Sequence, residues 1–298
     1  MPYFIEKGDL VSKNVDCIVN ASNVKLQMVE GVARAIFHRA GEDELTEACK
    51  YFKGCNVGDA VITPSFNLVN TKAIIHAVGP IYINGKHNEE KNLISAYNKC
   101  FKYVKDNKFN SIAFPLLSGE FNYPLYECFE VGRKTIYKNL IENPNLYVYT
   151  VMYKNFPEML NEEQKNEITN YVVNYKNYNK KVEVKKTFNE LITSYLKNTK
   201  YSHNELAARA NLTIDSLNKI IDKSYEEFIL KEHIFELVFA LDLNIDQMFE
   251  LLSSKNFTIE KGNLQDALVC LFLEKNDHDI LKLNSVFFQY NLRQLGSN

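Results

Sequence analysis

The sequence predicts two domains: an α/β domain with a mixed, mostly parallel sheet, followed by a small all-α domain. Short apolar runs alternate with amphipathic helical patterns in the first part of the chain, as in sheets covered by helices on both faces. All seven prolines and nine of the eleven glycines lie before residue 160. The polar stretch Tyr175–Lys181 has no apolar period. We therefore predict domains at residues 1–178 and 188–298, joined by a linker at 179–187.

The elements of the first domain follow from these runs. The predicted strands are Ile18–Val19, Asp59–Thr63, Ala73–Val78, Ser111–Leu117 and Leu146–Met152. The predicted helices are Val32–Ala40, Asp43–Phe52, Asn92–Lys105, Glu127–Asn143 and Pro157–Tyr175. Strand and helix alternate, which favours parallel pairing through crossover helices.

Composition excludes several classes of protein. The 298 residues carry a net charge of −2, which argues against a general nucleic-acid coat. The six cysteines form no C-x-x-C pair and no metal-ligand spacing, so we expect reduced thiols, no metal and no cofactor. The N-terminus lacks a basic segment before an apolar one, and no apolar run approaches about 18 residues. We expect a cytoplasmic protein without membrane contact.

The first forty residues carry the most functional information. Gly8-Asp9-Leu10 is followed by Asp16-Cys17-Ile18-Val19-Asn20-Ala21-Ser22-Asn23 and then by Gly31–Ile36. The order predicts a buried strand, a turn rich in asparagine, and a helix. Such a turn places amide groups and a helix N-terminus at the carboxyl edge of a sheet, where α/β folds hold nucleotides.

These residues resemble the macro domain family, which binds ADP-ribose. The resemblance covers about residues 1–178 and rests on six ordered matches: Gly-Asp-Leu at 8–10, Ile-Val-Asn-Ala-Ser-Asn at 18–23, His-Arg-Ala-Gly at 38–41, Val-Gly-Asp-Ala at 57–60, Ile-Ile-His-Ala-Val-Gly-Pro at 74–80 and Ala-Phe-Pro-Leu-Leu-Ser at 113–118. It implies a three-layer α/β/α fold. The whole chain is similar to bacterial proteins in which a MacroD-type domain carries a helical extension.

The resemblance implies roles for several residues. Asp9, followed by Leu10, matches the carboxylate that accepts a hydrogen bond from the adenine amino group, although an aspartate there can also cap a turn. Asn23 matches the amide that contacts the distal ribose, and Asn20 the one that holds the strand–loop junction. Tyr153 follows the last strand, where an aromatic residue stacks on adenine in many members. A core or surface tyrosine is nearly as compatible.

Both phosphate loops depart from the family pattern. The family has four glycines and then Val-Asp, with the aspartate implicated in hydrolysis; here the register reads Gln27-Met28-Val29-Glu30-Gly31-Val32-Ala33. The second loop reads Ser118-Gly119-Glu120-Phe121-Asn122-Tyr123-Pro124, one residue shorter and with an added acid. A carboxylate about 4 Å from a phosphate charge costs up to about 4 kcal/mol at an effective dielectric of 20. Glu30 and Glu120 therefore either oppose the diphosphate or point to solvent, and the sequence leaves both open.

No other residue pattern supplies catalysis. His38 and His76 are candidates by residue type, but a partnered core or turn histidine is the simpler interpretation of each. We predict recognition of ADP-ribose, or of a related ADP-ribosyl or O-acetyl-ADP-ribose group, with weak or absent hydrolysis. The alternative is a degenerate macro-domain scaffold or ligand-sensing regulator that acts through its helical domain.

The second domain is predicted to be helical. Its apolar periods and caps indicate helices at Phe188–Lys197, after Ser202 and after Thr213, then at Ile234–Leu241, Ile245–Leu252, Leu264–Glu274 and Asp279–Tyr290. The spacing around Asn211 resembles a helix-turn-helix of the phage-repressor type. Its second helix, Thr213–Asp222, exposes Asp215, Asn218, Lys219 and Asp222, which offers few phosphate contacts. DNA binding is therefore not expected, and a protein partner at residues 188–298 is.

Overall fold

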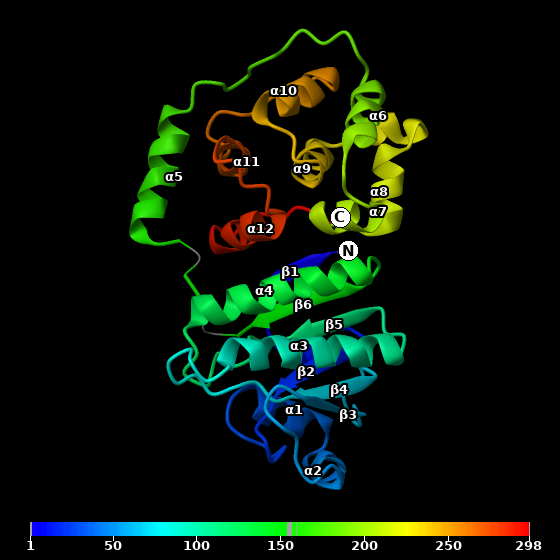
Figure 1. Cartoon of the computed structure of the whole chain (residues 1–298), viewed down its shortest axis with the longest axis vertical. Coiled ribbons are helices and arrows are strands. Elements are labelled where there is room, and N and C mark those ends of the chain that lie inside the picture. Colours follow the sequence, from blue (N-terminus) through cyan, green and yellow to red (C-terminus); the bar gives the residue numbers. More distant parts are fainter. Residues whose placement is uncertain (1, 154–156, 159, 298) are drawn as a thin grey trace. The chain divides into compact units, whose positions relative to one another are not determined.

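A computed structural model of the chain describes residues 2–153, 157–158 and 160–297. The chain divides into two compact units, one formed by Tyr3–Pro157 and the other chiefly by Glu158–Asn298. Figure 1 labels the helices and strands of both units. No helix in the described ranges is both long enough and apolar enough to span a membrane.

A six-stranded sheet forms the centre of the first unit. Its strands are β1 (Tyr3–Lys7), β2 (Cys17–Ala21), β3 (Ala60–Pro64), β4 (Ala73–Ala77), β5 (Ser111–Phe114) and β6 (Tyr147–Met152). The strand order is β1-β6-β5-β2-β4-β3, and only the β3–β4 pair is antiparallel. The prediction of a mixed, mostly parallel sheet is confirmed.

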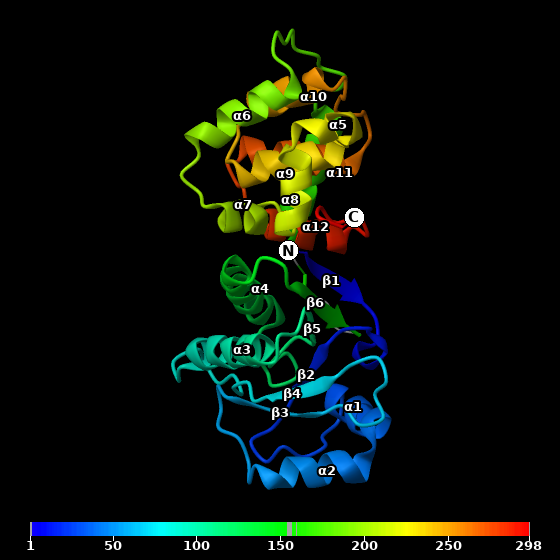
Figure 2. The ribbon, with the colours of Figure 1, turned by 90° about the vertical axis from the view of Figure 1, so that its right-hand side faces the viewer.

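Helices cover both faces of this sheet and complete three layers (Figures 1 and 2). They are α1 (Val32–Ala40), α2 (Glu42–Tyr51), α3 (Glu89–Asp106) and α4 (Leu125–Glu142). Ile18 and Ile74 pack in one core with Ile36 and Phe37 of α1. On the opposite face, Phe114 contacts the ring of Phe101 of α3 at 5.5 Å. Alternate residues of the strands therefore pack into two separate cores, one on each face of the sheet.

One strand was not predicted, and another ends three residues earlier than predicted. Strand β1 was not predicted, because it is a short strand at the edge of the sheet and only Tyr3 and Ile5 are buried from it. Strand β5 ends at Phe114 rather than at Leu117. Pro115 follows directly, and a proline has no N–H to continue a strand ladder.

The second unit is all helical, as predicted. Its helices are α5 (Glu162–Asn174), α6 (Phe188–Asn198), α7 (His203–Arg209), α8 (Ile214–Ile221), α9 (Lys231–Ala240), α10 (Ile245–Ser254), α11 (Leu264–Glu274) and α12 (Ile280–Gln289), with a 3-10 turn at Lys223–Phe228 (η2). Helices α9 and α11 are apolar on nearly every side and buried. Asp215, Asn218, Lys219 and Asp222 of the α8 region are exposed, as expected.

Helix α5 belongs to this helical unit, although composition alone assigned it to the first domain. Lys275 of α11 forms an ion pair with Glu167 of α5 at 2.6 Å. The compact units therefore change between Pro157 and Glu158. The predicted boundary at 178 and linker at 179–187 concern which segments fold independently, and they stay a prediction.

The C-terminal segment is held inside the helical unit. The side chains of Asn211 and Asn284 each donate to the carbonyl of Leu295 at 2.9 Å. The next amide, that of Gly296, donates to Glu236 Oε1 of α9 at 2.7 Å. Glu236 is 1% exposed, and burial raises its pKa to about 8. The tail thus ends on a buried carboxyl group.

Candidate functional site

A cavity of about 540 Å³ lies at the carboxyl edge of the sheet in the α/β unit. This volume is within the range of small-molecule sites. The lining comes from the ends of four parallel strands and from the start of two helices: Gly8, Asp9, Leu10, Ala21, Gly31, Val32, Ala35, Pro115, Leu116, Ser118, Gly119, Glu120, Phe121, Leu125, Val151, Met152 and Tyr153.

Most of the predicted ligand-binding residues meet in this cavity. Those that line it are Asp9, Leu10, Gly31, Val32, Ser118, Gly119, Glu120, Phe121 and Tyr153. Those outside the lining are Asn20, Asn23, Ala33 and Asn122. Segments more than a hundred residues apart in sequence are therefore brought to one edge of the sheet.

Asp9 both caps a turn and lines the cavity. It precedes the 3-10 turn Leu10–Ser12 (η1), and its Oδ1 accepts a hydrogen bond from the amide of Val11 at 3.2 Å. Its Oδ2 accepts one from the Ser12 hydroxyl at 3.3 Å. Each carboxylate oxygen keeps a further lone pair. The turn therefore orients a carboxylate that can still accept a hydrogen bond from a ligand.

The first loop ends at Gly31, the N-cap of α1. Gly31 has φ +79°, a conformation that glycine adopts without strain, and no side chain caps the helix. Glu30 lies outside the cavity lining and pairs with Arg34 at 3.1 Å, with both side chains mostly exposed. Ala33 points into the core and is 0% exposed. Only Gly31 and Val32 of this stretch reach the cavity, joined by Ala35 one turn on.

The second loop is held by backbone hydrogen bonds. The amide of Gly119 donates to the carbonyl of Leu116, and the amide of Phe121 to that of Ser118. Tyr82 donates its amide to the Phe121 carbonyl, and its ring lies 4.7 Å from that of Tyr123. The loop that carries Glu120 therefore has a defined backbone.

Two groups of this loop have no hydrogen-bond partner in the described part of the chain. The Ser118 hydroxyl is buried, and its residue adopts φ +65°. The Glu120 carboxylate reaches across to Gly31, where a Cβ atom would lie 2.3 Å from Oε2. Desolvation there raises the pKa of Glu120. Because buried polar groups are usually paired, Ser118 marks a place where a ligand can supply a partner.

Asn20 and His76 form a buried pair beneath the cavity. Asn20 Nδ2 donates to His76 Nδ1 at 3.1 Å, and His76 Nε2 lies 3.0 Å from Thr63 Oγ1. This arrangement matches a neutral imidazole with its proton on Nε2. Burial lowers the pKa of His76 to about 4. His76 is thus a partnered core residue, and His38 is exposed on α1 beside Glu42.

Comparison with known proteins places this α/β unit in a family. A model of the macro domain matches residues 19–131. An uncharacterized protein of Fusobacterium nucleatum is 42% identical over 142 residues, which are 47% of this chain and 80% of that protein. The O-acetyl-ADP-ribose deacetylase of Salmonella typhimurium is 42% identical over 135 residues, 44% of this chain and 74% of that enzyme. The chain belongs to the macro domain family.

Solved macro domains are also similar in sequence. The macrodomain of Oceanobacillus iheyensis with ADP is 32% identical to this chain, with a TM-score of 0.47. The match covers 57% of this chain and 90% of that one. A macro domain from ganglioside induced differentiation associated protein 2 is 28% identical with a TM-score of 0.48, over 57% of this chain and 82% of that one.

The remaining predicted residues of the macro domain shape its loops. Asn23 Oδ1 accepts from the amides of Lys25 and Gln27 at 3.0 and 3.2 Å, so this oxygen organises the first loop. Asn122 is exposed at φ +57° and ends the second loop. Their roles toward a ribose or a phosphate stay predictions.

Sequence reasoning missed the apolar lining of the macro domain cavity. The missed residues are Gly8, Ala21, Ala35, Pro115, Leu116, Leu125, Val151 and Met152. Each lies beside a predicted motif at a strand end or in the first turn of a helix. Because each missed residue lies next to a predicted motif, the positions of the motifs could have predicted that these neighbours line the cavity too.

The cavity holds no cationic group among the residues described. Its charged side chains are Asp9 and Glu120, and no Lys, Arg or His lines it. No group of three or more metal-ligating side chains occurs in the described ranges. An anion bound here would therefore rely on backbone N–H groups, helix N-termini and hydroxyls such as that of Ser118.

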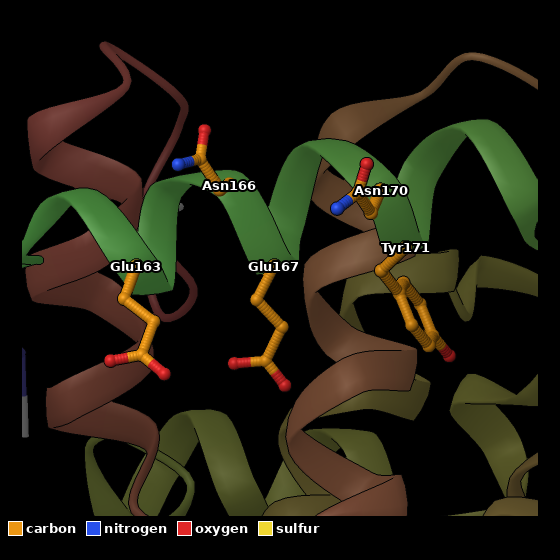
Figure 3. Close-up of a pocket in the computed structure, with 5 residues that line it drawn as sticks. All are labelled: Glu163, Asn166, Glu167, Asn170 and Tyr171. Carbon is orange, nitrogen blue, oxygen red and sulfur yellow. The ribbon is translucent and has the colours of Figure 1, made fainter.

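A second hollow lies on the helical unit, along one face of α5 (Figure 3). Its lining residues are Glu163, Asn166, Glu167, Asn170 and Tyr171. Glu163 and Glu167 project to the same side of the helix, while Asn166 points the other way. Glu167 is already paired with Lys275. Because these residues come from a single helix and share no partner, the candidate site is the macro domain cavity.

Proposed function

We propose that the macro domain binds ADP-ribose, or an ADP-ribosyl or O-acetyl-ADP-ribose group, in the cavity at its sheet edge. The observation that carries the proposal is the meeting of Asp9, Tyr153 and both phosphate loops around one cavity. The relatives named as O-acetyl-ADP-ribose deacetylases support this ligand class.

Each part of the cavity suits one part of such a ligand. Asp9 is oriented to accept from an adenine amino group, and Tyr153 is 68% exposed beside it, as a stacking ring requires. The open N-termini of α1 and α4 face the space between the loops, with Val32 and Leu125 in the lining. Helix N-termini favour phosphate through their N–H groups and dipole.

We propose that hydrolysis is weak or absent. Ala33 stands where the family pattern has an aspartate, and it is buried in the core rather than in the cavity. His76 lies outside the lining. It is buried, and this burial lowers its pKa, so that the imidazole is neutral near pH 7. Asp9 and Glu120 are the cavity's carboxylates, and Asp9 is engaged by its own turn. Among the described residues that line the cavity, no nucleophile is hydrogen-bonded to a general base, which supports weak or absent turnover.

The helical unit is proposed to bind a protein partner rather than DNA. Asp215 and Asp222 are exposed on the α8 region with Lys219 as the neighbouring cation. Asn218 is bonded to His203 at 2.7 Å, and Lys223 is a second exposed cation just beyond the helix. A DNA-reading face needs several cations for phosphate contacts.

The proposal is tested by calorimetric titration of the full chain with ADP-ribose, with ADP and GDP as controls. We expect a dissociation constant in the micromolar range, about −8 kcal/mol, and ADP preferred over GDP. Asp9→Asn keeps the turn acceptor but presents an NH₂ group to the adenine amino group, so affinity should fall about tenfold. Asp43→Asn, exposed on α2, is the matched control and should bind like the wild type.

Two outcomes would contradict the proposal. One is the absence of adenine-dependent binding at millimolar ligand, and the other is equal affinity in the wild type and Asp9→Asn. Release of acetate from O-acetyl-ADP-ribose at rates typical of enzymes, 1 s⁻¹ or more, would contradict the proposal of weak hydrolysis.

A further inference from the structure

The Glu120 side chain bridges the two phosphate loops. A Cβ atom on Gly31 would lie 2.3 Å from Oε2 and 2.6 Å from Oε1 of Glu120, so the carboxylate rests against the Gly31 backbone. The residues on either side, Gly119 and Phe121, donate their amides to Leu116 and Ser118. Glu120 is solvent-exposed, and its hydrogen-bonded loop places it in the lining of the cavity.

The Glu120 carboxylate lies against the N-terminus of α1, a helix of nine residues. Gly31 is the N-cap of α1, no side chain caps the helix, and no acidic residue lies in its first turn. The first N–H groups of such a helix lack intrahelical acceptors and carry a partial positive charge. Glu120 therefore brings a negative charge to the place where the macro domain would meet an anionic group of a ligand.

No cation in the described part of the chain pairs with this carboxylate. The cavity lining contains no Lys, Arg or His, and its remaining titratable groups are Asp9 and Tyr153. Arg34, the cation nearest in sequence to Gly31, is paired with Glu30. Glu120 therefore lines the cavity without an ion-pair partner among the described residues.

We propose that Glu120 is a specificity-determining residue whose carboxylate holds the diphosphate position of the cavity, so that anionic ligands must displace it while neutral adenosine need not. The inference rests on the proposed function, because it assigns the same cavity to an adenine ligand. It makes the wild-type chain a weaker receptor for ADP-ribose than its adenine and ribose residues alone would allow.

The chain offers a matched control in the first loop. Glu30 is one residue before Gly31, but its side chain is 87% exposed and bonded to Arg34. Both glutamates belong to phosphate loops, and only Glu120 lines the cavity. A general effect of net charge on an anionic ligand would appear in both variants, whereas an effect of position would appear only at Glu120.

The experiment titrates ADP-ribose and adenosine into the full-length wild type, Glu120→Gln and Glu30→Gln. Glutamine keeps the size of the side chain and removes its charge. We expect Glu120→Gln to bind ADP-ribose roughly ten- to hundredfold more tightly, since like charges about 4 Å apart repel strongly in a partly desolvated site. Adenosine affinity should stay within about twofold, and Glu30→Gln should match the wild type for both ligands.

The outcomes separate this inference from the proposed function. Equal ADP-ribose affinity in the wild type and Glu120→Gln overturns the inference and leaves adenine binding intact. An equal gain in Glu120→Gln and Glu30→Gln also overturns it, because net charge would then explain the effect. Binding of neither ligand to any of the three proteins contradicts the proposed function itself.

Discussion

The two units differ in how they treat the N-termini of their helices. In the described part of the α/β unit, α1 to α4 begin at Gly31, Gly41, Asn88 and Pro124, and none of these has a side-chain cap. In the helical unit, side chains cap seven of the helices described, through Asn161, Thr187, Ser202, Thr213, Asn244, Asn263 and Asp279. One unit leaves helix amides open, and the other closes them with its own residues.

Open helix N-termini can contact a ligand, whereas capped N-termini contribute to the stability of the unit. The open N-termini of α1 and α4 border the cavity, where a ligand can satisfy them. The capped helices of the second unit satisfy their own amides, and each cap adds to stability without creating a site. The helical unit therefore satisfies its own helix amides, whereas the macro domain leaves those of α1 and α4 open beside its cavity.

The buried ionisable groups differ in the same way. The macro domain buries His76 in its neutral form, with partners on both ring nitrogens. The helical unit buries Glu236, whose Oε2 has no hydrogen-bond partner among the described residues. Burial disfavours the charged form of both groups, so the two units respond to pH with opposite sign.

The largest predicted effect concerns Glu236. Its folded pKa of about 8 lies above the ordinary value of 4.5, so stability from the neutral form is present at low pH and lost as pH rises to 8. The loss amounts to roughly 5 kcal/mol in the helical unit. Glu236→Gln should remove this loss, measured by hydrogen exchange of α9 amides between pH 4.5 and 8. Glu227→Gln, exposed in the 3-10 turn of the same unit, is the control, and parallel pH curves for Glu236→Gln and the wild type would contradict the prediction.

A smaller effect of opposite sign is expected for His76. Its folded pKa of about 4 lies below the ordinary 6.5. Between these values the unfolded chain binds a proton at His76 and the folded macro domain does not. Stability should fall by roughly 3 kcal/mol as pH drops from 6.5 to 4. Exchange of β2 and β4 amides would show this in the wild type and in His38→Gln. A slope equally steep in His76→Gln would show that another group is responsible.

The smallest effect tests the caps themselves. Thr187 accepts from the amide of Glu190 at 3.3 Å and begins α6. Thr187→Ala should cost about 1 kcal/mol in the helical unit and leave ADP-ribose affinity unchanged. Ser194→Ala, inside the same helix, removes a hydroxyl without touching a cap. The contrast between the units would be weakened if both variants lost the same stability, or if Thr187→Ala altered ligand binding.

Much of the fold was predictable because its signals are local. Ser202 and Thr213 each precede an apolar period, which predicted them as the N-caps of α7 and α8, and both caps are present. The buried strand β2 and the loop after it were recognisable from Cys17–Val19 and the asparagines that follow. Strand β1 escaped prediction because an edge strand of five residues with two buried side chains has little periodicity.

The sequence predicted which segments form the candidate site, but not which way each of their side chains points. Nine of the predicted residues line the cavity, since the carboxyl ends of parallel strands meet at one edge. Asn20 does not line it, because it faces His76 across the β2–β4 pair. Ala33 does not either, because the second residue of α1 points into the core.

The sequence by itself determined most of the helices and strands, β1 excepted, and the loops that form the site, because caps, periodicity and motifs act over a few residues. Only the tertiary structure decided which glutamate meets the ligand space. Glu30 lies one turn from Arg34 and pairs with it, whereas Glu120 is carried by a loop that Tyr82 anchors and that faces Gly31. The direction of a loop side chain depends on such distant contacts, which no local pattern encodes.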